Sequence, residues 1–133
     1  MKAILAFVAL ALSAASAVPL LAQVTDYSRA QAVEVDLSNF KFTPAKVELR
    51  AGQPQLLTLI NKASGGHNFA AREFFAAADI APQDAGLVRK GSVEVEGGQS
   101  VTIHLVPKAG QYDLKCTHFG HSTFGMTGVI VVR

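Results

Sequence analysis

The sequence predicts an all-β domain, a β-sandwich or barrel into which one short helix is inserted. Three observations favour this fold class. Apolar and polar residues alternate along much of the chain, as they do in half-buried strands. Glycine and proline recur between the alternating segments and mark turns. With 133 residues, of which half are hydrophobic and 17% are charged, the chain suits one ordered domain and not a disordered one.

The alternating segments define about seven expected strands. They cover residues 31–37, 47–49, 56–60, 93–95, 101–105, 111–116 and 129–132. Turns are expected between them, for example at Gly97-Gly98. Several short strands with regular turns are typical of a sandwich or barrel. The Ala-rich segment 70–79 breaks the alternation and, with Phe74 and Phe75, predicts a short helix that packs on the core.

The N-terminus has the layout of a secretory signal peptide. Lys2 supplies a positive charge, residues 3–12 are all apolar, and residues 13–17 are small. The apolar run is too short for a membrane-spanning helix, which needs about 20 residues. We therefore expect a signal peptide over residues 1–22, cleaved after Ala17 or Ala22, with an uncleaved anchor as the alternative. A mature domain over residues 23–133 without a membrane span, exported to a bacterial periplasm, is expected to remain.

Charge and cysteine content narrow the function. The net charge is +2 and no block of like charges occurs, so a nucleic-acid partner is not expected. The single cysteine, Cys116, cannot form an internal disulfide. In an oxidising compartment a lone thiol needs an occupant, such as a metal. A domain of this size can stand alone, so a monomer is expected.

Cys116 begins a segment that concentrates soft metal ligands. A thiolate, an imidazole and a thioether follow one another in Cys116, His121 and Met126. Thiolate and thioether ligands select Cu(I), and imidazole suits copper in both oxidation states. A second imidazole is expected from His67, which follows the turn-forming pair Gly65-Gly66. Two histidines and one cysteine with a weak methionine form the blue-copper electron-transfer site.

These motifs resemble those of small cupredoxins of the plastocyanin, auracyanin and rusticyanin kind. The resemblance covers nearly all of residues 31–133, from Phe40-x-Phe42-x-Pro44 to Cys116-x4-His121-x4-Met126. It implies a Greek-key sandwich or barrel that binds one type 1 copper. By position it implies three strong ligands, His67, Cys116 and His121, and a weak axial ligand, Met126. Asn68 is expected to tie the two ligand loops together near the Cys116 sulfur.

Other side chains near these motifs have competing interpretations. His118 is the rival of His121 as a ligand, but a place at the surface or beside the ligands is the preferred interpretation. His104 shares the polar face of its strand with Thr102 and is expected to be solvent-exposed and without a role. Three aromatic side chains are expected to flank the ligands and exclude water: Phe69, Phe119 and Phe124.

The ligand set leads us to expect an exported one-electron carrier that cycles between Cu(II) and Cu(I). Transient redox partners are expected to dock near His121 through a small interface. An enzyme is not expected, because Met126 would fill the axial position and no catalytic base or nucleophile pair is recognisable. The main alternative is a periplasmic copper-binding protein for copper delivery, buffering or resistance. A metal-free sandwich used in adhesion or assembly is a further alternative.

Overall fold

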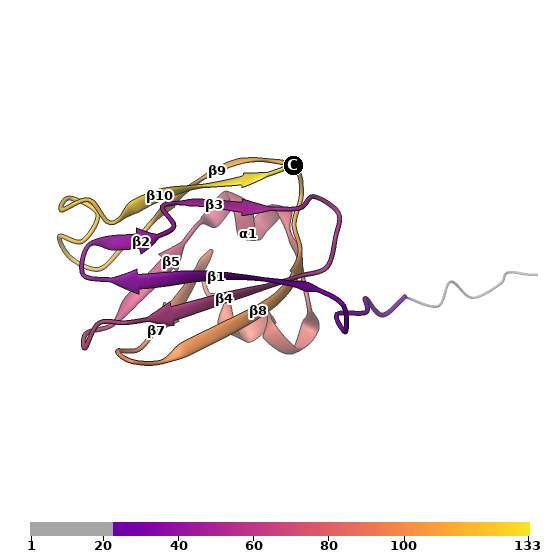
Figure 1. The fold of residues 1–133 in the computed structure, drawn as a ribbon, viewed down its shortest axis with the longest axis horizontal. Helices are drawn as coiled ribbons and strands as arrows, with labels where there is room; N and C mark the ends of the chain where they lie inside the picture. The colour runs from indigo at the N-terminus through magenta and orange to yellow at the C-terminus, as the bar shows by residue number, and fades with distance from the viewer. Residues whose placement is uncertain (1–22) are drawn as a thin grey trace, which may run out of the picture.

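The computed structural model describes residues 23–133, which form a sandwich of two five-stranded β-sheets (Figure 1). Within this range, one short α-helix and one 3-10 helix are inserted between strands. The prediction of an all-β sandwich with a short helix is therefore confirmed. The predicted signal peptide, residues 1–22, lies outside the described residues.

The first sheet has the strand order β2-β1-β4-β8-β6. Its strands are β1 (Gln31–Ser38), β2 (Lys41–Thr43), β4 (Gln55–Asn61), β6 (Asp79–Ile80) and β8 (Ser100–Val106). β1 runs parallel to β4, and the other neighbours are antiparallel. Asn39 and Phe40 form the turn between β1 and β2, because Ser38 pairs with Lys41.

The second sheet has the order β3-β10-β9-β5-β7. Its strands are β3 (Lys46–Leu49), β5 (His67–Ala70), β7 (Ser92–Val95), β9 (Gly110–Lys115) and β10 (Thr127–Val132). From β2 to β9, every connection crosses from one sheet to the other. The sequence pattern missed β2, β5 and β6 for a physical reason. β2 and β6 have three and two residues, and β5 buries its first three residues, so none of them alternates over a useful length.

The hydrophobic core lies between the two sheets. It is built from alternate residues of the long strands, as the period of two predicts. Buried side chains include Val35, Leu37, Leu57, Leu59, Ile103 and Leu105 from the first sheet and Val47, Phe69, Val95, Leu114 and Ile130 from the second. Burying one such side chain stabilises a fold by about 1.5–3 kcal/mol. The strand ends are therefore rigid supports for the residues that follow them.

The inserted helix, α1 (Arg72–Ala77), is shorter than the expected segment 70–79. It ends at Ala78, whose backbone is extended, and the next two residues pair with β8 as β6. Phe74 and Phe75 are buried in the core, as predicted. A 3-10 helix, η1 (Pro82–Leu87), follows, and the sequence contains no periodic signal for so short an element.

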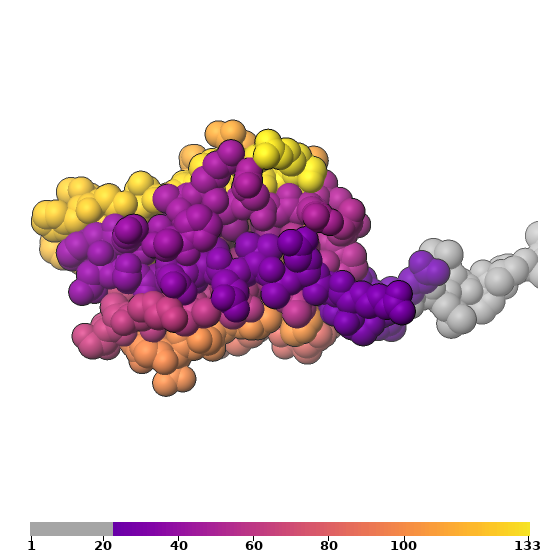
Figure 2. All heavy atoms as spheres, in the orientation of Figure 1, coloured from indigo at the N-terminus to yellow at the C-terminus, as the bar shows by residue number. Residues whose placement is uncertain are grey.

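The two ends of the sandwich differ. At one end the β9–β10 loop, residues 116–126, projects beside the β1–β2 turn, and the two touch in the space-filling view (Figure 2). The N-terminal segment leaves the domain at the other end (Figure 1). Cys116, His121 and Met126 all belong to the projecting loop. Three of the four predicted ligands therefore lie at the end opposite to the one where the first described residues, from Gln23 onward, leave the domain.

Candidate metal centre

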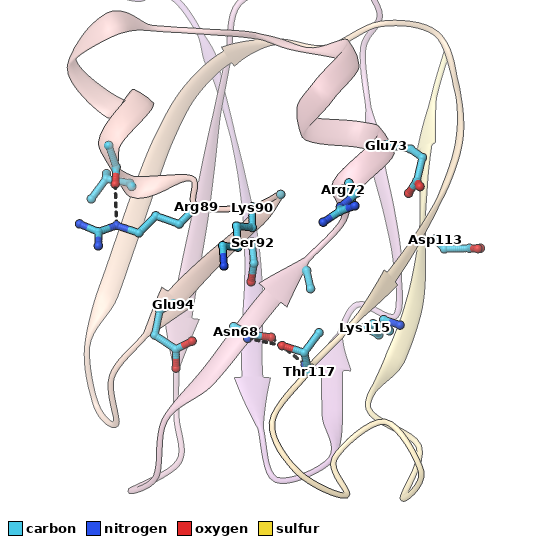
Figure 3. A pocket seen from close by; sticks show the side chains of 14 residues that line it. Asn68, Arg72, Glu73, Arg89, Lys90, Ser92, Glu94, Asp113, Lys115 and Thr117 are labelled. Atoms are coloured by element: carbon cyan, nitrogen blue, oxygen red, sulfur yellow. Dashed lines mark hydrogen bonds between the residues drawn. The ribbon is translucent and has the colours of Figure 1, made fainter.

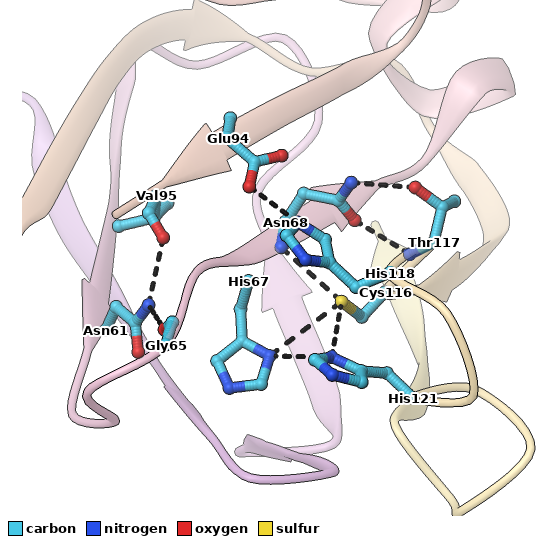
Figure 4. A network of polar contacts seen from close by, with 10 residues as sticks. All are labelled: Asn61, Gly65, His67, Asn68, Glu94, Val95, Cys116, Thr117, His118 and His121. Atoms are coloured by element: carbon cyan, nitrogen blue, oxygen red, sulfur yellow. Dashed lines mark hydrogen bonds and ion pairs between the residues drawn. The ribbon is translucent and has the colours of Figure 1, made fainter. Parts of the chain in front are cut away.

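Antiparallel strand pairing brings the predicted ligands together. His67 is the first residue of β5, and Cys116 directly follows the last residue of β9. These strands are antiparallel neighbours, with Ala70 opposite Lys115. The start of β5 and the loop after β9 therefore lie at the same end of the second sheet (Figure 4).

Asn61 fixes the loop that leads to His67. Its side chain is buried, and its amide nitrogen donates to the carbonyls of Gly65 and Val95, both at 2.9 Å. Its amide oxygen accepts from the Ala63 N–H at 2.9 Å. One side chain thus joins the β4–β5 loop to β7 (Figure 4). This role was not predicted, although an asparagine at the end of a strand and before a turn is a known signal for such bonds.

Three donor atoms face one another at this end of the sheet (Figure 4). The Nδ1 atoms of His67 and His121 are 3.1 Å apart, and the Cys116 Sγ lies 3.4 Å from the His121 Nδ1 and 3.9 Å from the His67 Nδ1. A point equidistant from all three atoms lies about 2 Å from each, close to common metal–nitrogen and metal–sulfur distances. Among the described residues this is the one group of three or more such ligands.

Burial favours the neutral imidazole that a metal requires. His67 is 1% exposed and Cys116 is fully buried. Burial lowers the pKa of His67 below its ordinary value of 6.5, and the neighbouring His121 and His118 lower it further. With its proton on Nε2, a neutral His67 presents a lone pair on Nδ1 toward the sulfur and the other imidazole. Donor lone pairs this close repel one another, so a cation among them fits the arrangement.

Backbone and side-chain hydrogen bonds tie β5 to the residue after Cys116. The Asn68 N–H approaches the Cys116 Sγ at 3.5 Å. The Asn68 amide donates to the Thr117 hydroxyl at 2.7 Å and accepts from the Thr117 N–H at 2.8 Å. The two segments that carry His67 and Cys116 are therefore linked beside the sulfur.

Met126 closes the β9–β10 loop through its backbone. Its N–H donates to the His121 carbonyl at 2.9 Å, and its carbonyl accepts from the Cys116 N–H at 3.1 Å. Its side chain is fully buried. A methionine directly before a strand is thus held beside the cysteine and the histidine of the same loop.

His118 lies beside the donor atoms and does not join them. Its Nε2 is 2.6 Å from the carboxylate of Glu94 on β7, and a third of its side chain is exposed. Its ring stacks on that of His121, with ring centres 5.4 Å apart and an angle of 22°. His118 therefore contacts the Glu94 carboxylate through its Nε2 and stacks on the His121 ring.

Two expectations about water exclusion are wrong. Phe119 and Phe124 are exposed, with 103% and 71% of their surface accessible, because both lie on the projecting loop. Phe69 is fully buried as expected. The aromatic side chain that contacts His121 is instead Phe40, whose ring centre lies 5.2 Å away at an angle of 83°. No pattern along the chain links Phe40 in the β1–β2 turn to His121, which lies 81 positions later.

The expectation for His104 is also wrong. Its Nδ1 and its backbone N–H both contact the Asp84 Oδ2, at 2.8 and 2.7 Å. Asp84 is buried, and the Tyr27 ring packs edge-on against His104 with ring centres 5.2 Å apart. His104 is 32% exposed and joins β8 to η1 and to the N-terminal segment. Strand alternation predicts a solvent-facing His104, and the contact with Asp84 is not predictable because η1, which supplies the carboxylate, has no sequence signal.

A hollow of about 950 Å³ lies on the outer side of the Asn68–Thr117 link (Figure 3). Its lining includes four cationic side chains, Arg72, Arg89, Lys90 and Lys115, and three carboxylates, Glu73, Glu94 and Asp113. The donor atoms of His67, Cys116 and His121 do not line it. The hollow is therefore separate from the cluster of donor atoms.

Comparison with known proteins identifies the family. Residues 29–133 match the family of copper-binding proteins described as plastocyanin/azurin. The chain belongs to the plastocyanin/azurin family of copper-binding proteins. Copper is thus its cofactor, and the cupredoxin resemblance found in the sequence is confirmed. A comparison with curated proteins finds no match.

This chain is similar in fold to solved cupredoxin structures. Auracyanin B is similar with a TM-score of 0.58 and 20% identity, over 83% of this chain and 94% of that chain. Dithionite-reduced auracyanin from Roseiflexus castenholzii has a TM-score of 0.57 and 19% identity, over 78% and 98%. The McoA multicopper oxidase of Aquifex aeolicus has a TM-score of 0.58 and 14% identity, over 84% of this chain and 31% of that chain. The predicted cupredoxin-like Greek-key fold is confirmed.

The cupredoxin domain contains no membrane-crossing candidate among its helices. Within the described range 23–133, neither helix has the length and the apolar content needed to cross a membrane.

Proposed function

We propose that this cupredoxin is a type 1 copper protein that carries single electrons, with His67, Cys116 and His121 as its strong ligands and Met126 as its weak axial ligand. The triangle of two Nδ1 atoms and one Sγ, with sides of 3.1, 3.4 and 3.9 Å, carries the proposal. Two imidazoles and a thiolate in a trigonal arrangement form the donor set of blue copper. The buried side chain of Met126, in the same loop, supports the fourth assignment.

Bound copper would supply one-electron chemistry by alternating between Cu(II) and Cu(I). The chain's own residues keep the ligands in place for both states. His67 and Cys116 stand at the ends of core strands, and the two Asn68–Thr117 hydrogen bonds hold those ends together. The Asn68 N–H, directed at Sγ, would draw charge from the sulfur when that sulfur binds the metal. A rigid site of this kind favours electron transfer over catalysis, so we propose no enzymatic activity.

A redox partner is proposed to dock around His121. This ligand lies on the projecting loop, where the exposed Phe40 ring packs on it and the exposed Phe124 ring packs on Phe40. Small apolar contacts suit transient redox encounters. The low net charge of the chain leaves little long-range steering for partner selection.

The proposal also covers location and assembly. We propose that residues 1–22 are an export signal removed after Ala17 or Ala22 and that residues 23–133 act as a periplasmic monomer. The charged, apolar and small-residue sections of the N-terminus support export.

Copper delivery, buffering or resistance is the second candidate function. One observation favours it: Cys116, His121 and Met126 belong to one projecting loop, so three of the four ligands could release copper together. A delivery protein would exchange copper readily, whereas an electron carrier would retain it through many redox cycles.

Copper titration of the purified protein tests the proposal. We expect Cu(II) to produce an intense blue thiolate-to-copper absorption band, reversible voltammetry and slow copper loss to a chelator. Cys116→Ser should abolish the band, whereas His104→Asn, which changes a histidine remote from the donor atoms, should keep it. A colourless mixture would falsify the type 1 assignment. A blue protein that loses its copper to the chelator within seconds would favour delivery.

A further inference from the structure

Phe40 occupies a backbone conformation that disfavours its side chain. It is the second residue of the β1–β2 turn, and its φ is +61°, in the left-handed region. Left-handed backbone suits glycine or asparagine, and a bulky residue there is a genuine outlier. Such strain persists where the surrounding structure requires it, often at functional sites. The preceding Asn39 would suit the conformation better, yet the phenylalanine occupies it.

Core burial does not explain the strained side chain. The Phe40 side chain remains 41% exposed, whereas its near neighbour Phe42 is almost fully buried. The ring contacts of Phe40 are with the β9–β10 loop. It packs on His121 at 5.2 Å and 83° and on Phe124 at 5.3 Å and 46°. Its carbonyl oxygen lies 3.9 Å from the position that a Cβ on Gly125 would take.

His121 needs support of this kind. A metal-binding histidine usually donates its second ring N–H to a fixed acceptor, which sets the orientation of the ring. Among the described residues, the hydrogen-bond contacts of the His121 ring are through Nδ1 alone, to His67 and Cys116. Its remaining ring contacts are aromatic, with Phe40 on one side and the stacked His118 on another.

From these observations we infer that Phe40 is a positioning residue for copper: the strained β1–β2 turn holds its ring against His121 and keeps the Nδ1 directed at His67 and Cys116. The inference rests on the proposed ligand role of His121. Phe40 belongs to the first sheet, whereas the proposed ligands belong to the second sheet and its loops. The inferred contact therefore joins the two sheets at the proposed metal site. A glycine at position 40 would have a relaxed backbone, but it would leave the His121 imidazole free to rotate. The strained phenylalanine is therefore retained.

Phe40→Gly relieves the backbone strain and removes the ring in one change. Folding stability and the positioning of His121 should therefore respond in opposite directions. We expect the metal-free variant to melt at the same temperature as the natural protein or higher. Copper loss to a chelator should be faster by about tenfold or more, the usual effect of removing a group that orients a ligand. In the metal-free protein, the imidazole protons of His121 should change from one sharp set of NMR signals to broadened or multiple signals.

Two control variants complete the test. Phe40→Tyr keeps the ring and should restore both slow copper loss and the single set of His121 signals. Phe119→Ala removes a fully exposed ring from the same loop and should leave both unchanged. The inference is overturned if Phe40→Gly leaves the His121 signals unchanged, if it retains copper as well as the natural protein does, or if its metal-free form is less stable. The NMR measurement needs no copper, so it stands even if the type 1 assignment fails.

Discussion

At the residue scale, burial affects the proton affinity of His67, the proposed ligand on β5, before any metal binds. The side chain is 1% exposed, and its Nε2 is buried with no hydrogen-bond partner among residues 23–133. Burial lowers the pKa of His67, with His121 and His118 adding to the effect. The folded protein therefore keeps this imidazole neutral to lower pH than the unfolded chain does, whose imidazole takes up a proton below about pH 6.5.

This difference predicts acid sensitivity of the metal-free protein. Below pH 6.5 the unfolded state binds more protons at residue 67 than the folded state does, so the free energy of unfolding falls with falling pH. The loss stops once the pH is below the folded-state pKa. Urea unfolding at pH 7.5 and 5.5 measures this decrease in the free energy of unfolding. The decrease should be smaller for His67→Gln than for the natural protein. An equal loss in both proteins would contradict the prediction.

At the scale of elements, two loops beside the site are locked together by backbone contacts. The Gly98 N–H donates to the Ala63 carbonyl at 3.0 Å, which joins the β7–β8 turn to the β4–β5 loop. Gly97 lies so close to this loop that a Cβ on it would be 2.0 Å from the Ser64 carbonyl oxygen. Asn61 ties the same loop to β7. These contacts determine where β5, and with it His67, begins.

We expect Gly97→Ala to destabilise the fold by about 1–3 kcal/mol, because the new methyl group would force two backbone segments apart. Gly65→Ala is the matched control in the adjoining loop. A Cβ there meets no atom within 4 Å, so its effect should be neutral or stabilising by up to about 1 kcal/mol. Denaturant unfolding of both variants measures the difference. Equal stability of the two variants would show that the loops can separate without cost.

At the scale of the whole molecule, the proposed copper would bind together segments that are distant in sequence. His67 opens β5, while Cys116, His121 and Met126 lie between β9 and β10. The β1–β2 turn of the other sheet packs on the same loop through Phe40. The end of the sandwich with the proposed site therefore depends on both sheets being assembled, and metal binding there should in turn stabilise the assembled state.

Copper addition should accordingly raise the melting temperature. Free metal at 100 times its dissociation constant stabilises the folded state by about 2.7 kcal/mol, or roughly 10 °C for a domain of this size. Calorimetry with and without Cu(II) measures the shift, and a chelator should reverse it. In Cys116→Ser, copper should raise the melting temperature much less than it does in the natural protein. A shift of equal size in that variant would mean that copper stabilises the protein from another site.

Local patterns were sufficient to predict the fold class and the family. Val33, Val35 and Leu37 alternate in a strand because one face of the sheet must be buried, and period two is visible in any sequence. The spacing from Cys116 to Met126 is also local, since one loop carries both residues. His67 was expected as a ligand because it follows the turn-forming pair Gly65-Gly66, and the structure brings its Nδ1 to within 3.9 Å of the sulfur.

Contacts between distant segments could not be predicted in the same way. The Glu94 partner of His118 and the Asp84 partner of His104 come from other elements, so His104 was wrongly assigned to solvent. Phe119 and Phe124 were wrongly placed around the ligands, because hydrophobic character alone does not tell whether a loop residue faces inward.

The sequence by itself determined the alternation of strands, the cupredoxin identity and the set of candidate ligands, because each depends on residues close together along the chain. Only the tertiary structure decided that two imidazole nitrogens and one sulfur converge, that Asn61 and Asn68 hold the loops, and that Phe40 packs on His121. These contacts join positions up to 81 residues apart. Such pairs meet through strand order and sheet packing, which no local pattern encodes.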